Sequence, residues 1–191
     1  MTIKQASAAD TPAIARLILL AIGDIASQLT SETDETKILE RLEAFIDAEG
    51  NRFSRSCILA KEAKGVPAGM ILCYHGKDAD LLYEPVLEHL RRKTGNPDIA
   101  IDRETESDEY YIDAIAVDPR HQGQGFAKQL IDAAERKAAD SGYERIALNV
   151  DQTNEKAHAL YSKLGYVADK QITINGHSFW HMVKPLHRMT K

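Results

Sequence analysis

The sequence lacks the features that would place it in several specialised classes of protein. It has only two cysteines in 191 residues, Cys57 and Cys73, which are too few for a disulfide-rich scaffold or a cysteine zinc cluster. Both lie in apolar runs, so we expect two buried thiols within strands. The longest apolar run near the N-terminus, at residues 17–22, is far too short to span a membrane, and the first residues do not form a secretion signal. We therefore expect a cytoplasmic protein without a membrane partner.

The chain also lacks a strong excess of positive charge and a convincing set of metal ligands. Its net charge is -5, from 24 basic and 29 acidic residues, so nothing indicates a nucleic-acid partner. His177 and His181 are four residues apart, but on a strand that spacing defines a face rather than a zinc site. We expect surface and packing roles for all seven histidines, and no metal. The length and the 43% hydrophobic content indicate a single domain over residues 1–191.

Helices and strands alternate along the first 75 residues. Apolar residues recur at helical spacing at residues 14–22 and again at residues 34–49, where Gly50 can end the helix in a left-handed turn. A short strand precedes them at residues 2–5, and two strands follow at residues 56–62 and 68–75. The turn residues at 64–67 predict that this pair forms a hairpin.

An acidic segment at residues 78–109 interrupts this regular pattern. It contains ten acidic and four basic residues, a local balance of -6. A short helix at residues 81–92, interrupted by Pro85, is its only regular feature. A loop this long within one domain is usually functional or disordered, although a solvated excursion would explain the same composition. We interpret it as a variable acidic insertion before the fourth main strand.

Regular structure returns in the second half of the chain. We expect a buried strand at residues 110–117, a helix at 127–140, a strand at 145–150 and a helix at 154–164. Two further strands, at residues 166–174 and 179–183, flank Asn175-Gly176, the preferred pair for a tight hairpin turn. This alternation, ending in a hairpin, predicts an α/β fold with a mixed sheet.

The segment Gln122-Gly123-Gln124-Gly125 joins the strand at 110–117 to the next helix. Such a turn directs free backbone N–H groups and the positive end of a helix dipole at one point, where a phosphate binds well. Glycine lets the backbone approach the anion closely, and Lys128 adds a positive charge. A Rossmann loop is the alternative, but Lys128 occupies the place of its third glycine. The Gly-Lys-Ser/Thr of a Walker loop is absent.

Two motifs resemble those of the GNAT N-acetyltransferase superfamily. Residues 117–127 are similar to its Gln/Arg-x-x-Gly-x-Gly/Ala motif, with Gln122, Gly125 and Ala127 at the three defined places. The run from Asn154 to Tyr166 is similar to the family's Asn…Ala…Tyr…Leu-Gly-Phe/Tyr helix. The resemblance is specific over residues 110–166. It implies an α/β (α+β) fold in which helices flank a central mixed, mostly antiparallel, twisted sheet.

The resemblance implies acetyl-CoA as co-substrate. In this family the pantetheine arm pairs with the strand before the glycine loop, and a backbone N–H near Ile115 would polarise the acetyl carbonyl. Asn154 would contact the coenzyme as well as cap its helix. The remaining implied coenzyme contacts are Ile115, Ala116 and Val117 for the arm, and Gln122, Gly123, Gln124, Gly125, Phe126, Ala127 and Lys128 for the pyrophosphate.

Amine acetylation requires a base for the ammonium and an acid for the departing thiolate. Tyr161 stands where the family's tyrosine acid usually stands, although helical spacing also fits a half-buried core tyrosine. Asp113 is our candidate base, because polyamine-acetylating relatives have a glutamate there and an isolated buried charge is expensive. A salt bridge is the alternative explanation for Asp113. Many relatives place a glutamate base on the next strand, where this chain has Asn149, so a water relay through Glu109 or Asp151 is a further alternative.

These residues predict an N-acetyltransferase that transfers an acetyl group to a primary amine of a small cationic molecule. Carboxylates near the acceptor site would attract such an amine. Acetylation of a protein, at an N-terminal amine or a lysine, is the second hypothesis. A non-catalytic acyl-CoA-binding module is the third, and fold resemblance alone does not exclude it. The sequence leaves a homodimer open.

Overall fold

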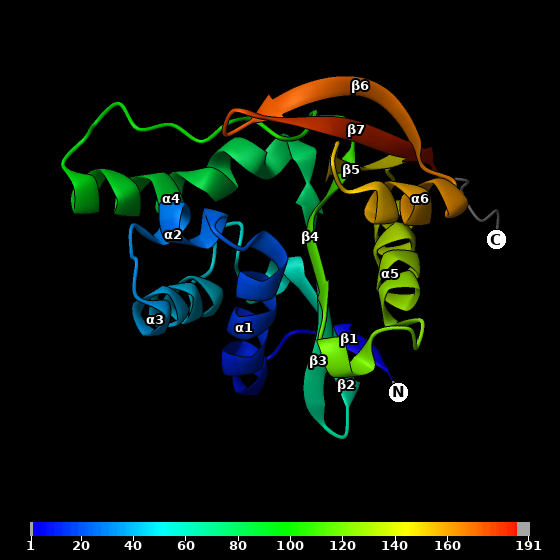
Figure 1. Ribbon diagram of the computed structural model, residues 1–191, viewed down its shortest axis with the longest axis horizontal. Coiled ribbons are helices and arrows are strands. Elements are labelled where there is room, and N and C mark those ends of the chain that lie inside the picture. Colours follow the sequence, from blue (N-terminus) through cyan, green and yellow to red (C-terminus); the bar gives the residue numbers. More distant parts are fainter. Residues whose placement is uncertain (1, 187–191) are drawn as a thin grey trace.

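The protein is built around one seven-stranded sheet with helices on both faces (Figure 1). The structure is a computed structural model that describes residues 2–186. Within these residues the strand order is β1-β2-β3-β4-β5-β7-β6. Among the strands of the described part of the chain, only β4 and β5 pair in parallel, and every other neighbouring pair is antiparallel. The expected mixed, mostly antiparallel sheet is therefore confirmed.

The elements follow the hydrophobic pattern closely, with shifts of a few residues at their ends. The strands are β1 Ile3–Gln5, β2 Ile58–Ala63, β3 Val66–His75, β4 Tyr110–Val117, β5 Arg145–Asp151, β6 Val167–Ile174 and β7 His177–Pro185. The α-helices are α1 Thr11–Ile22, α2 Ile25–Thr30, α3 Glu35–Asp47, α4 Ala79–Thr94, α5 Phe126–Asp140 and α6 Glu155–Lys163. Asn175 and Gly176 both have positive φ, 49° and 77°, as the predicted β6–β7 turn requires.

Two local expectations in the N-terminal half were incomplete. Gly23, with φ of 52°, ends α1, and the chain immediately forms a further short helix, α2, that the periodicity did not predict. The helix α3 ends at Asp47 with an extended cap at Ala48. Gly50 therefore has its left-handed conformation, φ 80°, in the turn beyond the helix rather than at its end.

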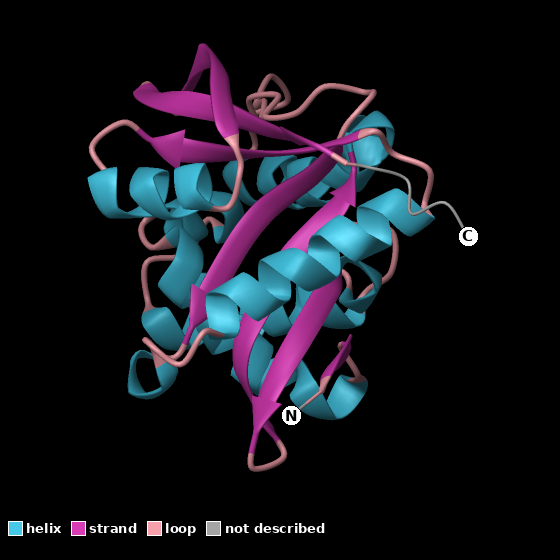
Figure 2. Ribbon diagram, turned by 90° about the vertical axis from the view of Figure 1, so that its right-hand side faces the viewer, coloured by secondary structure: helices cyan, strands magenta, loops and turns pink. Residues whose placement is uncertain are grey.

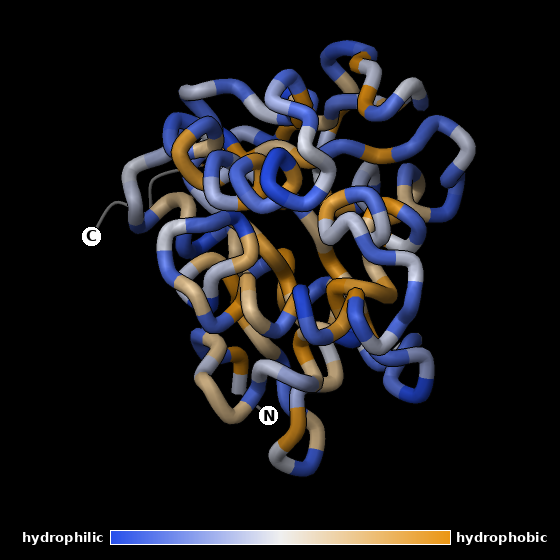
Figure 3. Tube along the Cα trace, turned by 90° about the vertical axis from the view of Figure 1, so that its left-hand side faces the viewer, coloured by the Kyte–Doolittle hydropathy of each residue, from blue (hydrophilic) through white to orange (hydrophobic). Residues whose placement is uncertain are grey.

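Each face of the sheet has its own core. Helices α1 to α4 cover one face, on which Ile14, Leu42, Phe53 and Tyr74 belong to one apolar cluster. Helix α5 covers the other face, where Leu130 and Ile131 pack with residues of β3, β4 and β5. Figure 2 views the molecule from this second side and shows a long helix lying obliquely across the strands. Apolar segments gather in the interior and polar ones at the periphery (Figure 3). This distribution is expected for a sheet whose two faces are both covered by helices.

The strand β4 contains a bulge at Asp113. Its pairing with β3 skips this residue, because Leu72 faces Ala114 while Cys73 faces Ile112. The extra residue reverses the alternation, so Ala114 faces the α1 side of the sheet, as Tyr111 does. β-bulges commonly occur next to active sites, where they redirect side chains.

The acidic segment is more ordered than its composition predicted. Half of it is α4, the longest helix among the described residues, which runs through Pro85. A proline inside a helix removes one backbone hydrogen bond, and near this position the carbonyl of Leu82 accepts a hydrogen bond from the backbone N–H of Arg52, at 2.9 Å. The rest of the segment runs beside the β6–β7 hairpin (Figure 1), where Asn175 N–H donates to Asp102 at 2.8 Å.

Candidate active site

The parallel strands β4 and β5 separate at the centre of the molecule. They pair only from Tyr110 with Ile146 to Ile112 with Leu148, although both strands continue beyond that point. From residue 113 onward, one edge of β4 therefore has no neighbouring strand within residues 2–186 to satisfy its backbone groups. An unpaired strand edge of this kind is a template for an extended ligand with amide groups. Ile115, Ala116 and Val117 lie on this stretch of β4.

The glycine loop follows β4 and ends at the start of α5. Asp118 fixes its first turn by accepting a hydrogen bond from the backbone N–H of Arg120, at 2.9 Å. Gly125 precedes the first helical residue, Phe126, with φ of 78°. An added Cβ there would be strained at that φ, and space around it is otherwise open up to the Gln129 side chain at 3.7 Å. The first N–H groups of α5 have no partner inside the helix, which makes this a site suited to an anion.

Side chains around the loop stabilise its shape. Phe126 is buried, stacks on the His121 ring at 5.6 Å between centroids, and lies 4.8 Å from the Lys61 ammonium. The amides of Gln122 and Gln124 donate to the carbonyls of Val117 and Arg120, at 3.5 and 3.3 Å. These predicted coenzyme residues thus brace the loop with their side chains and leave its backbone to face a ligand.

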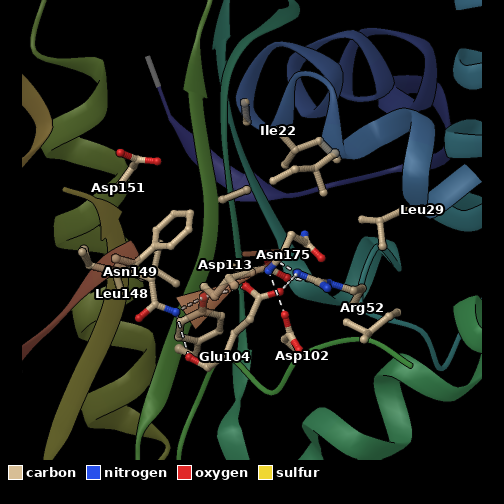
Figure 4. A pocket seen from close by; sticks show the side chains of 18 of the residues that line it. Ile22, Leu29, Arg52, Asp102, Glu104, Asp113, Leu148, Asn149, Asp151 and Asn175 are labelled. Atoms are coloured by element: carbon tan, nitrogen blue, oxygen red, sulfur yellow. Dashed lines mark hydrogen bonds and ion pairs between the residues drawn. The ribbon is translucent and has the colours of Figure 1, made fainter. Parts of the chain in front are cut away.

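A pocket of about 490 Å³ opens where β4 and β5 separate. Figure 4 shows Leu148, Asn149 and Asp151 on one side of it, Ile22, Leu29 and Arg52 on the other, and Asp113 and Glu104 between them. Four predicted site residues line it: Asp113, Ile115, Asn154 and Tyr161. The other predicted contacts do not line it and lie further along β4, in the glycine loop and in the first turn of α5: Ala116, Val117, Gln122, Gly123, Gln124, Gly125, Phe126, Ala127 and Lys128.

Helix α6 supplies two residues to the coenzyme side of the pocket. Asn154 caps the helix, since its side-chain oxygen accepts a hydrogen bond from the Ala157 N–H at 3.0 Å. Tyr161 is 8% exposed and packs against the ring of Tyr166, with centroids 5.9 Å apart. Burial raises the pKa of Tyr161 to about 12, so its phenol keeps its proton at neutral pH and is available as a donor.

The carboxylate of Asp113 is bound by Arg52 through two hydrogen bonds. Arg52 Nη2 lies 2.6 Å from Oδ1 and Nε 2.9 Å from Oδ2, while the Tyr74 hydroxyl also donates to Oδ2 at 2.9 Å. The Asp113 side chain is only 3% exposed. Burial opposes the charge of Arg52, but Asp113 and Glu104 outweigh it and raise the pKa of Arg52 above its usual value. This geometry matches the salt-bridge alternative for Asp113, and its role as base stays a prediction.

A second carboxylate, Glu104, lies beside this ion pair. Arg52 Nη2 is 3.3 Å from its Oε1, and the Tyr111 hydroxyl donates to its Oε2 at 3.0 Å. Burial raises the pKa of Glu104 above its usual value; the charge of Asp113 adds to this, and Arg52 and Tyr111 oppose it. Neither Arg52 nor Glu104 was predicted from the sequence. Arg52 comes after a helix and belongs to no motif that would mark it as a site residue. Glu104 is one of ten acidic residues in its segment, and the sequence does not single it out.

The two alternative relay residues occupy different environments. Asp151 lines the pocket and accepts hydrogen bonds from Thr153. Glu109 is fully buried and contacts His181 at 3.2 Å, and it is not among the pocket residues. His181 itself is buried between Glu109 and Asp169, so its role in the described structure is one of packing and ion pairing within the core. Neighbouring carboxylates outweigh burial and raise its pKa.

The remaining expectations concern thiols, metals and membranes. Cys57 and Cys73 are free and buried, as predicted. Within residues 2–186, no three or more His, Cys, Asp and Glu side chains are grouped as metal ligands would be. In the same part of the chain, every helix is too short or too polar to cross a bilayer.

Comparison with known proteins identifies the family that this site and fold define. Residues 20–166 match the acetyltransferase (GNAT) family, and the chain belongs to that family. A crystal structure of an acetyltransferase is 33% identical to it, with a TM-score of 0.81 over 98% of this chain and 100% of that chain. An N-acetyltransferase from Staphylococcus aureus Mu50, 24% identical over 96% of this chain and 100% of that one, shares the fold with a TM-score of 0.82.

Curated relatives match over a shorter region. The [ribosomal protein bS18]-alanine N-acetyltransferase of Haemophilus ducreyi (strain 35000HP / ATCC 700724) is 39% identical over 67 residues, which are 35% of this chain and 44% of that protein. The alignments span less than half of the length of the curated relatives that the chain matches. These similarities therefore support the family assignment but do not identify the substrate that accepts the acetyl group.

Proposed function

We propose that this protein is an acetyl-CoA-dependent N-acetyltransferase that acetylates a primary amine of a small cationic molecule within a ternary complex. The observation that supports it most is the pocket at the separation of β4 and β5, because Ile115 and Tyr161 line it together with Asp113 and Glu104. One cavity would thus hold both the thioester and the positively charged amine. The coenzyme would pair with β4 beyond residue 113 and place its pyrophosphate on the N-terminus of α5.

The chemistry requires a defined sequence of proton transfers. A carboxylate takes one proton from the bound ammonium, and the neutral amine attacks the carbonyl carbon of the thioester. The N–C bond forms as the C–S bond breaks, with a backbone N–H near Ile115 stabilising the negative oxygen. Tyr161 gives its proton to the departing thiolate and regains one as the acetylated nitrogen loses its second proton. The balance is one amide, one free thiol and one proton released.

Acetylation of a protein N-terminus is the second candidate. It is favoured by the likeness to the Haemophilus ducreyi relative, whose name specifies an alanine of a ribosomal protein as the acceptor. A non-catalytic coenzyme-binding module is the third candidate, and it predicts affinity for acetyl-CoA without turnover. The proton donor Tyr161 in the pocket argues for an enzyme.

Two measurements on the purified chain separate these candidates. Calorimetry with acetyl-CoA tests binding, and thiol release with small amines and with peptides tests transfer. We expect binding and amine-dependent thiol release. Binding without thiol release from any amine or peptide would reject the enzyme, and release with peptides alone would reject the small-molecule acceptor.

A further inference from the structure

The acceptor side of the pocket has an apolar wall. Four half-buried isoleucines, which we call the isoleucine wall, line it and pack against the core on the α1 side of the sheet. They are Ile22 of α1, Ile25 of α2, and Ile99 and Ile101 of the segment after α4. Leu29 and Phe53 extend the same surface. Apolar area in a binding pocket contributes about 25 cal/mol per Å² when a ligand covers it, so this side favours an apolar body.

The carboxylates of the acidic segment mostly face away from this wall. Arg103 binds Asp80 at 3.2 Å, and Arg145 binds Asp108 at 2.7 Å. Further ion pairs join Glu84 to Arg91, Glu106 to Lys170 and Glu109 to His181. Of the ten acidic residues of this segment, only Asp102 and Glu104 line the pocket. The -6 balance of the segment therefore does not produce a broadly acidic acceptor site.

Glu104 is the pocket carboxylate best placed to receive an ammonium group. A carboxylate has about four lone-pair sites, and Glu104 uses two of them, for Arg52 and Tyr111. Asp113 accepts three hydrogen bonds, two of them from one guanidinium, and its side chain is 3% exposed against 13% for Glu104. Asp102 is exposed and accepts from the backbone of Asn175. Of the two carboxylates that contact the buried Arg52, Glu104 thus combines greater access with more unused acceptor capacity.

Two neighbouring residues hold Glu104 in place. The Asn149 amide donates to the backbone carbonyl of Glu104 and to the Tyr111 hydroxyl, both at 2.8 Å, and Tyr111 in turn donates to the Glu104 carboxylate. Burial keeps the pKa of Tyr111 well above its usual value, so this donor stays protonated. The Oδ1 atom of Asn149 is buried and has no partner among the described residues. It is therefore an unused acceptor beside the carboxylate.

We propose that the acceptor is a primary monoamine on an apolar body, whose ammonium group pairs with Glu104 and whose body lies against the isoleucine wall. This inference rests on the proposed function. Glu104 accepts the first proton of the ammonium, Tyr111 and Asn149 act as positioning residues, and the other proton transfers remain as described above. A second ammonium on the body would lie against the apolar wall and lose its hydration there, and such burial is costly.

A matched pair of amines tests the apolar body. Pentylamine and cadaverine have the same five-carbon chain and differ by one terminal ammonium group. We expect kcat/KM in the thiol-release assay to be at least about tenfold higher for pentylamine. Equal or better activity with cadaverine or spermidine would overturn this inference, but it would still support the proposed acetyltransferase activity. Preference for a peptide with an apolar first residue would also overturn it, because the acceptor would be a protein.

Glu104→Gln tests the carboxylate, and Glu84→Gln is the matched control on the surface of α4. We expect Glu104→Gln to lower kcat for pentylamine by about a hundredfold, while Glu84→Gln leaves kcat unchanged. In the wild type, kcat should fall as the pH drops through the pKa of Glu104. The ionisable groups facing this carboxylate are Arg52, Asp113, Tyr111, Tyr74 and Tyr83. In the Glu104→Gln variant, this fall of kcat at low pH should disappear. An unchanged kcat, together with the same fall at low pH, would exclude Glu104 as the base.

Ile99→Asn tests the wall independently of the chemistry. Ile172→Asn on β6 is the control, because Ile172 is also half-buried but does not line the pocket. We expect Ile99→Asn to raise KM for pentylamine about tenfold with little change in kcat, and Ile172→Asn to change neither. Melting temperatures of both variants separate loss of fold from loss of the wall. A folded Ile99→Asn enzyme with wild-type KM would overturn the assignment of the wall.

Discussion

The two sides of the active-site pocket are built in different ways. The predicted coenzyme side consists of neighbouring residues of one segment, from β4 through the glycine loop into α5, and it would present mainly backbone groups. The acceptor side brings together Ile22, Arg52, Glu104 and Asn149, which are far apart in the chain, and it presents side chains. Backbone recognition depends on local conformation, whereas side-chain recognition depends on how the whole domain packs. We therefore expect the first side to tolerate most distant changes and the second to respond to them.

The largest expected effect is on the acceptor side, from Arg52→Met. Removing the guanidinium leaves Asp113 buried with an uncompensated charge, which typically costs about 3–5 kcal/mol of unfolding free energy. Urea denaturation measures the loss. The double variant Arg52→Met with Asp113→Asn should recover a substantial part of it, because the isolated charge is gone. A loss below about 1 kcal/mol in the single variant would show that the pair contributes little, and that the two sides do not differ in this respect.

Tyr161→Phe tests the point where the two sides meet. The substitution keeps the ring and its packing on Tyr166 but removes the proton donor. We expect kcat to fall about a hundredfold, or roughly 2.7 kcal/mol, with acetyl-CoA affinity nearly unchanged. Tyr143→Phe is the control, since Tyr143 lies outside this pocket. If kcat of the Tyr161 variant equals that of the control, Tyr161 serves only in packing.

Gly125→Val addresses the coenzyme side alone. Its side chain would project from the loop at a φ that disfavours it, so acetyl-CoA affinity should drop at least about tenfold, or 1.4 kcal/mol. Gly142→Val is a matched control, because Gly142 has a similar φ of 84° beyond the other end of α5. Both variants should lose stability, but only the first should lose affinity in calorimetry. Equal affinities in two folded variants would remove the loop from the coenzyme site.

The smallest expected effect concerns salt. Because six of the ten acids of the segment between β3 and β4 are engaged in ion pairs, long-range attraction of an amine should be weak. We expect KM for the amine to rise less than about threefold between low and physiological ionic strength, where the screening length shortens to about 8 Å. Stopped-time thiol assays at several salt concentrations measure it. A rise above about tenfold would show that the segment steers cationic acceptors, as its composition alone suggested.

The sequence by itself determined the fold family and the mixed, mostly antiparallel sheet, and it was enough to predict a coenzyme side. The strand, glycine loop and helix at residues 110–128 form a local pattern, as does the helix that begins after Asn154. Glycine positions, helix caps and hydrophobic periodicity within a few residues determine the conformation of each segment. Even the β6–β7 turn follows from the two residues Asn175 and Gly176. Short-range rules suffice wherever the relevant groups belong to one segment.

Tertiary structure alone decided which side chains meet on the acceptor side. Asp113 was visible in the sequence as a charge in an apolar strand, but its partner Arg52 is 61 residues away and follows no motif. Nothing in the sequence distinguishes Glu104 from nine other acids of its segment until Arg52, Tyr111 and Asn149 surround it. The bulge at Asp113 and the helix through Pro85 are equally non-local, because packing against β3 and Arg52 stabilises conformations that local propensity does not select.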